Sequence, residues 1–216
     1  MPLHTLIRRC SAAMLVMMCM NAHAQAQAPV DLAQAVDAIW RVRSTTLHFQ
    51  SPHTYYYCDI LQQRVADIMR AVGAGDPMDV RAKCAVGSLI NDTSIRIVAG
   101  LPVEATDANV RAETSFDTRT ELVAQTRNWK LPTPQTVRRF RALRTEISFA
   151  RLDRLHLSPS DCDLLAAMSE QVFPEYGVRT TVPLYCTPGS SPLARPGLVV
   201  ETLMPVTSLS AATVSK

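Results

Sequence analysis

Two histidines and two aspartates occupy matching places in two parts of the chain. His53 precedes Asp59 and His156 precedes Asp163, and each aspartate directly follows a cysteine. Imidazole and carboxylate groups bind divalent metals, and the same pair of groups can move a proton near neutral pH. If the fold brings the two places together, the four side chains would hold a metal or serve a small hydrolase. The alternative is structural, because the helix dipole favours an acid at a helix start and a loop histidine is commonly just solvated.

The positions of these groups depend on a short sequence that the chain contains twice, a Cys-Asp-aliphatic-Leu tetrad. The tetrads are residues 58–61 and 162–165. Each follows an alternating apolar and polar stretch, at 45–49 and at 145–149. Each is followed by a Val-Arg pair, a second cysteine and an apolar run. Features that recur in the same order predict two copies of one folding unit.

Each copy is predicted to fold as strand, helix, strand, strand. The first helix is expected to begin after Thr54 and to end at Gly73, where glycine stops the apolar stripe. The second is expected to begin after Ser158, with Pro159 at its first position, and to end at Pro174. Turn sequences separate the two strands that follow each helix. The expected strands are 79–86 with 94–101 in the first copy, and 178–186 with 197–204 in the second.

The same arrangement predicts how the cysteines pair. If the first two strands of a copy are parallel neighbours, the helix between them is a right-handed crossover. The start of that helix and the end of the next strand then lie at the same end of the sheet. This geometry favours Cys58 with Cys84 and Cys162 with Cys186 over the other pairings. The predicted fold class is therefore α+β, with two tandem βαββ pseudo-repeats, helices packed on one face of a mixed sheet, and two disulfides.

The N-terminus has the features of a secretory signal peptide. A basic lead and an apolar run precede small residues, with a cut expected after Ala24 or Ala26. Cys19 offers a lipoprotein alternative, but the residues before it are not the small ones that lipidation requires. The predicted organisation is a signal peptide at 1–24, a first βαββ unit at 30–103, a linker at 104–136 with one extra strand or short helix, a second βαββ unit at 137–206 and a flexible tail at 207–216.

The composition without this leader excludes some partners. Removing Arg8 and Arg9 leaves 20 Lys and Arg against 19 Asp and Glu, a net charge of +1. Such a chain lacks the positive field that drives binding to phosphate backbones, so no nucleic acid partner is expected. No later stretch approaches the ~20 apolar residues of a transmembrane helix. The remaining cysteines are even in number and too widely spaced for a zinc knuckle, which indicates disulfides in an oxidising compartment.

An aromatic cluster is the preferred candidate for a recognition surface. It lies directly before the first tetrad and has no counterpart in the second copy. Tyrosine offers a large contact area at low entropic cost, although it can equally cover a helix end. The cluster consists of Tyr55, Tyr56 and Tyr57.

Arginines form two further candidates. Arg81 and Arg179 stand at matching places and would clamp an anionic ligand, although surface pairing with acids is the simpler interpretation. The stretch from Arg138 to Arg154 concentrates positive charge and would contact anionic envelope lipid, unless nearby acids neutralise it.

The usual catalytic motifs are missing from the sequence. The leading interpretation is a non-enzymatic binding or interaction module without a cofactor, periplasmic or secreted, whose partner is an unknown small molecule or protein of the cell envelope. One alternative is a small envelope hydrolase or metal-binding protein that uses the His and Asp residues named above. Another is an envelope-surface binder that works through the Arg138 to Arg154 stretch.

Overall fold

The computed structural model describes residues 32–186 and 195–207. The predicted signal peptide lies outside these ranges, as does all of the predicted tail except Thr207. Among the described residues, none of the helices combines the length and the apolar character that crossing a bilayer requires.

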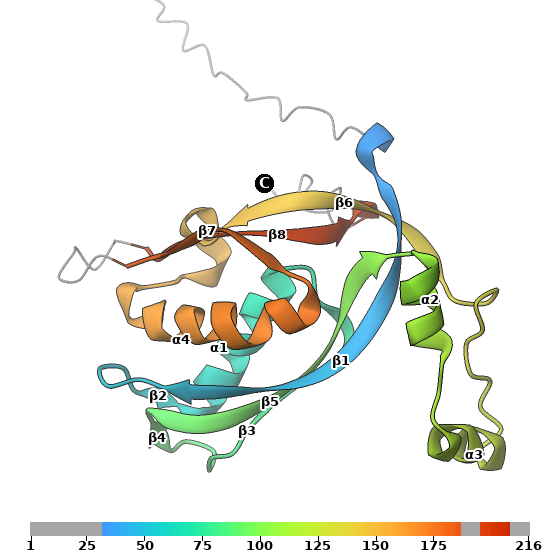
Figure 1. Cartoon of the computed structure of the whole chain (residues 1–216). Helices are drawn as coiled ribbons and strands as arrows, with labels where there is room; N and C mark the ends of the chain where they lie inside the picture. The colour runs from blue at the N-terminus through green and yellow to red at the C-terminus, as the bar shows by residue number, and fades with distance from the viewer. Residues whose placement is uncertain (1–31, 187–194, 208–216) are drawn as a thin grey trace, which may run out of the picture. The chain divides into compact units, whose positions relative to one another are not determined.

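The strands of the described ranges form one six-stranded sheet and one small two-stranded sheet. In the large sheet the order is β3-β5-β1-β6-β8-β7, and each neighbouring pair is antiparallel (Figure 1). The small sheet pairs β2 with β4. The bounds are β1 (Val36–Gln50), β2 (Tyr56–Tyr57), β3 (Gly75–Ala82), β4 (Leu89–Ile90), β5 (Asp92–Glu104), β6 (Arg139–Ser148), β7 (Arg179–Tyr185) and β8 (Gly197–Pro205).

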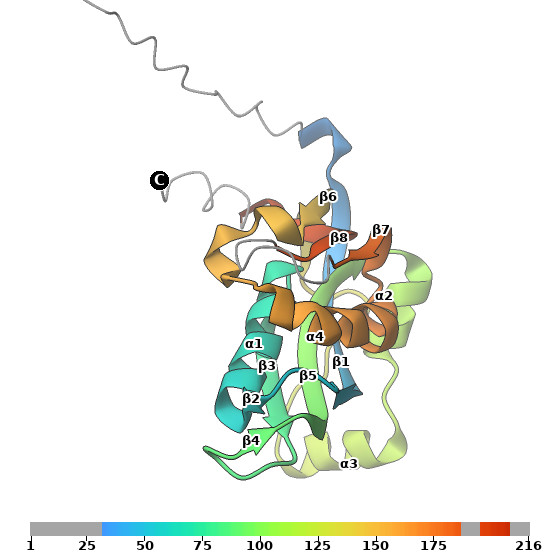
Figure 2. The ribbon, with the colours of Figure 1, turned by 90° about the vertical axis from the view of Figure 1, so that its left-hand side faces the viewer.

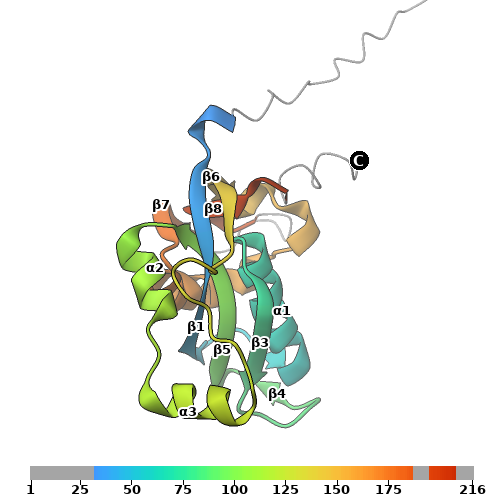
Figure 3. The same cartoon turned by 90° about the vertical axis from the view of Figure 1, so that its right-hand side faces the viewer.

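Two α-helices pack between the two halves of the sheet, and two lie on the opposite face of it. The inner helices are α1 (Cys58–Ala71) and α4 (Cys162–Ala167), and α4 continues as a π-helical stretch at Met168–Val172. Figures 1 and 2 show both between the half of the sheet that contains β1 and β5 and the half that contains β6, β8 and β7. Figure 3 shows α2 (Asp107–Thr114) and α3 (Thr118–Thr126) on the other side of β1 and β5 from α1. The predicted linker thus contains two short helices, where the sequence indicated one element.

The prediction of a mixed sheet is wrong, because the pairings in the described sheets are antiparallel. The first two strands of the first predicted copy, β1 and β3, are parallel to each other but are not neighbours, since β5 lies between them. The long alternating pattern of β5 explains this: it pairs with β1 from Asp92 opposite Gln50 to Glu104 opposite Ala38. The crossover through α1 therefore connects two parallel strands, β1 and β3, and β5 lies between them, antiparallel to both.

The predicted disulfides are confirmed. Cys58 is bonded to Cys84 and Cys162 to Cys186, with Cα–Cα distances of 6.0 and 6.2 Å. The pairing follows because β1 and β3 still run in the same direction, so the start of α1 and the end of β3 lie at one end of the sheet. Each disulfide fixes the start of an inner helix to the end of an outer strand.

The helix ends follow the sequence in part. Thr54 is not the N-cap of α1, because residues 56 and 57 pair with β4 and the helix begins at Cys58. Gly73 does end α1: its φ of +98° is favourable for glycine, and a Cβ there would lie 2.7 Å from the Met204 sulfur. Before α4, the Ser158 amide and hydroxyl both donate to the Asp161 carboxylate, at 2.8 and 2.9 Å. Pro174 follows the helical stretch, as predicted.

One apolar core runs through both halves of the sheet. It contains Leu47 and Phe49 of β1, Leu61 and Ile68 of α1, and Val200 of β8, each completely buried. The Thr202 hydroxyl of β8 also donates to the Val72 carbonyl at the end of α1, at 2.9 Å. The first inner helix is therefore packed against strands from both halves of the sheet.

The two halves of the sheet meet in a short strand pairing. β1 pairs with β6 over four residues, from Val36 opposite Ala142 to Ile39 opposite Arg139. Beyond it the two strands separate, as Figure 1 shows. Further along β1, the Gln171 amide takes the place of a strand: it accepts from the His48 amide at 2.9 Å and donates to the His48 carbonyl at 3.1 Å. The separation leaves a fork between β1 and β6.

Removing either disulfide should destabilise the fold by a similar amount. The bonded cysteines are separated by 26 and 24 positions, so the loops that they close are nearly equal. The chain-entropy model gives about 3 to 4 kcal/mol for loops of this size. Guanidinium unfolding of the two double Cys→Ala variants should show losses of this order in each. Non-reducing peptide mapping that finds a bond between the halves would contradict the structure.

Candidate functional site

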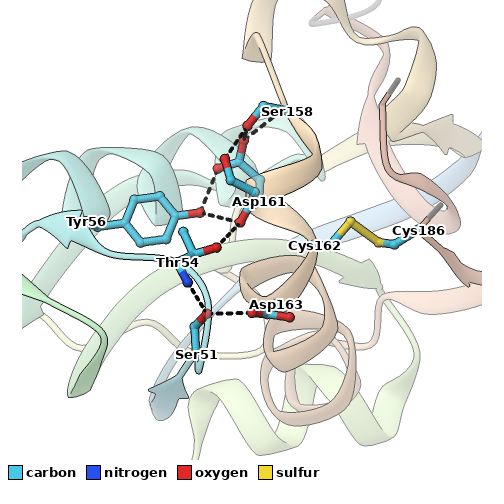
Figure 4. The surroundings of a disulfide bond; sticks show 9 residues. Ser51, Thr54, Tyr56, Ser158, Asp161, Cys162, Asp163 and Cys186 are labelled. Carbon is cyan, nitrogen blue, oxygen red and sulfur yellow. Dashed lines mark hydrogen bonds between the residues drawn. A yellow bond between two sulfur atoms is a disulfide. The ribbon is translucent and has the colours of Figure 1, made fainter. Parts of the chain in front are cut away.

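The segments that precede the two inner helices lie against each other. The Ser51 hydroxyl donates to the Asp163 carboxylate at 2.5 Å, and the Thr54 hydroxyl donates to the Ser160 carbonyl at 3.1 Å. Figure 4 shows these side chains beside the Cys162–Cys186 disulfide. The contacts connect the loop after β1 with the start of α4.

Asp161 is the buried centre of this contact, with 1% of its surface exposed. Its carboxylate accepts from the Tyr56 hydroxyl at 2.8 Å, as well as from Ser158. The Arg64 Nε lies 3.6 Å from the same carboxylate, and the Arg64 guanidinium also donates to the Leu155 carbonyl. A buried carboxylate is tolerated when it is paired and hydrogen-bonded in this way. We call Tyr56, Arg64, Ser158 and Asp161 the interhelix clasp.

The predicted metal residues are not gathered into one cluster. The Asp163 carboxylate accepts a hydrogen bond from Ser51, whereas His53, Asp59 and His156 are exposed. Among the described residues, no group of three or more His, Cys, Asp or Glu side chains could hold a metal ion. His156 ends a short 3₁₀ turn with a left-handed φ of 46°. The sequence drew attention to the histidines, whereas the buried and hydrogen-bonded carboxylate belongs to Asp161, which was not among the predicted site residues.

Two tyrosine hydroxyls are held in the protonated form by their surroundings. Burial, together with the Asp161 carboxylate beside it, raises the pKa of Tyr56 far above its ordinary value. Burial also raises the pKa of Tyr176 to about 12. The Tyr176 hydroxyl donates to the carbonyls of Arg43 and Ile97, each at 3.1 Å. Both hydroxyls are structural donors.

The predicted tyrosine cluster divides between the core and the surface. Tyr56 is buried, whereas Tyr55 and Tyr57 are 57% and 55% exposed. Tyr57 stands opposite Leu89 in the β2–β4 pair, and Leu89 is also exposed. The Cys58 amide donates to the Ser88 carbonyl at 2.9 Å, so the residue before β4 is hydrogen-bonded to the start of α1 (Figure 2).

Further exposed apolar side chains lie on the segments that the β2–β4 pair and the Cys58–Cys84 disulfide connect. Ile60 is on the first turn of α1, and Val86 is in the loop before β4. We call the exposed set the aromatic rim; it consists of Tyr55, Tyr57, Ile60, Val86 and Leu89. Strand pairing and the Cys58–Cys84 disulfide connect the segments that carry these side chains.

The structure does not bring the two predicted arginines together. Arg81 lies on β3 and Arg179 on β7, the two outer strands of the described sheet. Arg81 pairs with Asp79 at 2.9 Å, and Arg179 pairs with Glu201 at 3.1 Å.

Acids neutralise part of the predicted basic stretch. Arg141 pairs with Asp37 at 3.2 Å. Arg144 contacts both Glu104 and Glu201. The stretch is therefore less positive than its sequence indicates.

Comparisons with protein-family models, with curated proteins and with solved structures find no match for this chain. Its function is therefore inferred from its residues and their geometry.

Replacing Asp161 should be more costly than replacing Asp163. Asp161→Ala leaves the Tyr56 hydroxyl, the Ser158 amide and the Arg64 guanidinium short of an acceptor, which should cost about 3 kcal/mol of unfolding free energy. Asp163→Ala removes the hydrogen bond from Ser51 at a less buried position, for about 1 kcal/mol. Denaturant unfolding of both variants gives the comparison. Equal losses would mean that Asp161 has no special role in joining the halves.

The raised tyrosine pKa values predict alkaline destabilisation. The folded state favours the neutral phenol, so this contribution to stability is complete below the ordinary pKa of 10.0 and is lost as pH rises toward 12. Tyr176→Phe removes one titrating group, and its unfolding free energy should fall less steeply with pH over that interval. Tyr185→Phe, at an exposed position, is the control. Parallel pH profiles for wild type and Tyr176→Phe would contradict the assignment.

Proposed function

We propose that the chain is an exported, disulfide-stabilised module of two βαββ repeats that binds a protein of the cell envelope through the aromatic rim. The observation that carries the proposal is that five large apolar side chains are exposed on the β2–β4 pair, the first turn of α1 and the segments beside them, which strand pairing and the Cys58–Cys84 disulfide connect. Contiguous exposed apolar surface on a water-soluble fold marks interaction sites. The rim includes two of the three tyrosines that the sequence selected.

The strand order supports the repeat. The first half runs β1, α1, β3, β5, and β5 lies between the other two strands. The second half runs β6, α4, β7, β8, and β8 likewise lies between the other two. Both halves also have a disulfide from the helix start to the end of the outer strand.

The cysteines support export. Each of the four in the described ranges is in a disulfide, and such bonds persist in oxidising compartments such as the periplasm. The leader at 1–24, with its apolar run and small residues, is the segment that would direct export. We therefore propose the periplasm or the cell exterior as the place of action.

The rim suits a protein partner that offers apolar side chains. Its tyrosines provide rigid rings, and Tyr57 and Leu89 are neighbours across a strand pair. The adjoining Asp59 and Lys83 are both exposed and opposite in charge, which favours a protein surface of mixed charge over an anionic lipid surface. The second half has no equivalent rim, because Ser160 and Asp161 of its corresponding segment contact the first half.

A photo-crosslinking amino acid at position 57 should capture the partner in cells that export the chain. The same amino acid at position 185 is the control, because Tyr185 is 67% exposed but lies on β7. We expect one discrete adduct from position 57 that excess wild-type protein suppresses and that position 185 does not form. No adduct, or the same adduct from both positions, would refute the rim as the binding surface.

The captured protein, once purified, allows a quantitative test. Leu89→Ser should raise its Kd for this chain by about tenfold or more, because one desolvated aliphatic anchor is worth at least 1.4 kcal/mol. Val182→Ser is the matched control, since Val182 is a comparably exposed aliphatic residue on β7. Equal Kd values for the two variants would count against the proposal.

A further inference from the structure

A cavity lies between β5 in one half of the sheet and β6, β7 and β8 in the other. It has a volume of about 560 Å³, and residues of α2 and of the turn before β7 also line it. A smaller hollow of about 150 Å³ adjoins it, and the two share Val103, Tyr176 and Gly177 in their linings. We call the two together the fork cavity. Its size is within the range of small-molecule sites in proteins.

Four arginines and three glutamates line the fork cavity, and a fourth carboxylate, that of Glu113, interacts electrostatically with two of the arginines. Arg41 and Arg43 come from β1 at one end, and Arg144 and Arg179 come from β6 and β7 at the other. The glutamates are Glu104, Glu175 and Glu201.

The glutamates are already engaged at the end formed by Arg144 and Arg179. Glu201 pairs with Arg179 at 3.1 Å and with Arg144 at 3.4 Å, and Glu104 contacts Arg144. Each guanidinium has five N–H donors, so a shared carboxylate leaves donors for a further acceptor. The pairing orders the two arginines before any ligand arrives.

Carboxylates also stand near the other end. Arg43 lies 3.8 Å from Glu175, and both side chains are substantially exposed. The Glu113 carboxylate accepts from the Val42 backbone and attracts the guanidinium groups of Arg41 and Arg43. Among the described residues, the Arg41 side chain has no carboxylate at contact distance. A guanidinium of this kind, facing no fixed acid at contact distance, is suited to a carboxylate of a ligand.

We propose that the fork cavity binds a small organic molecule with two separated acidic groups, one held by Arg41 and Arg43 and the other by Arg144 and Arg179. Guanidinium pairs recognise carboxylate and phosphate alike, so the shared chemistry is a dianion on an organic scaffold. The distance between the two arginine pairs selects the length of that scaffold. This site is separate from the aromatic rim and does not depend on the function proposed for it.

Linear dicarboxylates from succinate to suberate test the inference, with the matching monocarboxylates and inorganic phosphate beside them. Isothermal titration of the purified protein should show binding with an optimum chain length that weakens in salt. Monocarboxylates and phosphate should bind about tenfold more weakly or worse, since each engages one arginine pair. A flat dependence on chain length, or phosphate binding as tightly as the best dicarboxylate, would overturn the two-ended site.

Variants test the residues. Arg41→Gln and Arg179→Gln should each raise the Kd of the best dicarboxylate about tenfold. Arg81→Gln is the matched control, because Arg81 is equally an arginine of an outer strand, but lies on β3. Arg41→Gln breaks no pairing within the described residues, so it should fold, as circular dichroism will verify. Leu89→Ser, in the aromatic rim, should leave dicarboxylate binding unchanged. The proposal would be refuted if no dicarboxylate binds at millimolar concentration, or if both arginine variants bind as well as the wild type.

Discussion

The four-residue pairing between β1 and β6 is the constraint on which the rest of the structure depends. Because the strands separate after it, the halves of the sheet cannot continue as one flat layer, and α1 and α4 occupy the space between them. The apolar core consequently belongs to both halves. The fork cavity and the contact between the helix starts are two results of the same separation.

The interhelix clasp holds the two halves together at the helix starts. The Asp161 carboxylate of the second half receives the Tyr56 hydroxyl of the first, and each helix start is also fixed by a disulfide. Tyr56 thereby faces inward while its neighbours Tyr55 and Tyr57 face solvent. The same interaction that joins the halves therefore sets the orientation of the proposed binding surface.

The sequence predicted the local elements and the disulfides better than the sheet. The cysteine pairing depends on the direction of β1 and β3, which the strand, helix, strand order implies, whereas their separation by β5 depends on long-range pairing. Successive side chains of an extended segment point to opposite sides, and this rule could have predicted that Tyr56 is buried while Tyr55 and Tyr57 are exposed. The fork cavity could not have been predicted from the sequence. Arg144 and Arg179 both pair with Glu201 because β8 lies between β6 and β7, and the sequence does not reveal this strand order.

Native-state hydrogen exchange tests most directly whether the halves form one cooperative unit. Ile97 of β5 and Val200 of β8 are buried in strands of opposite halves. If the shared core and the clasp unite the halves, both amides exchange by global unfolding, with equal opening free energies that match the denaturant value. Exchange of the β8 amides through a separate opening, well below the free energy for β5, would contradict this account.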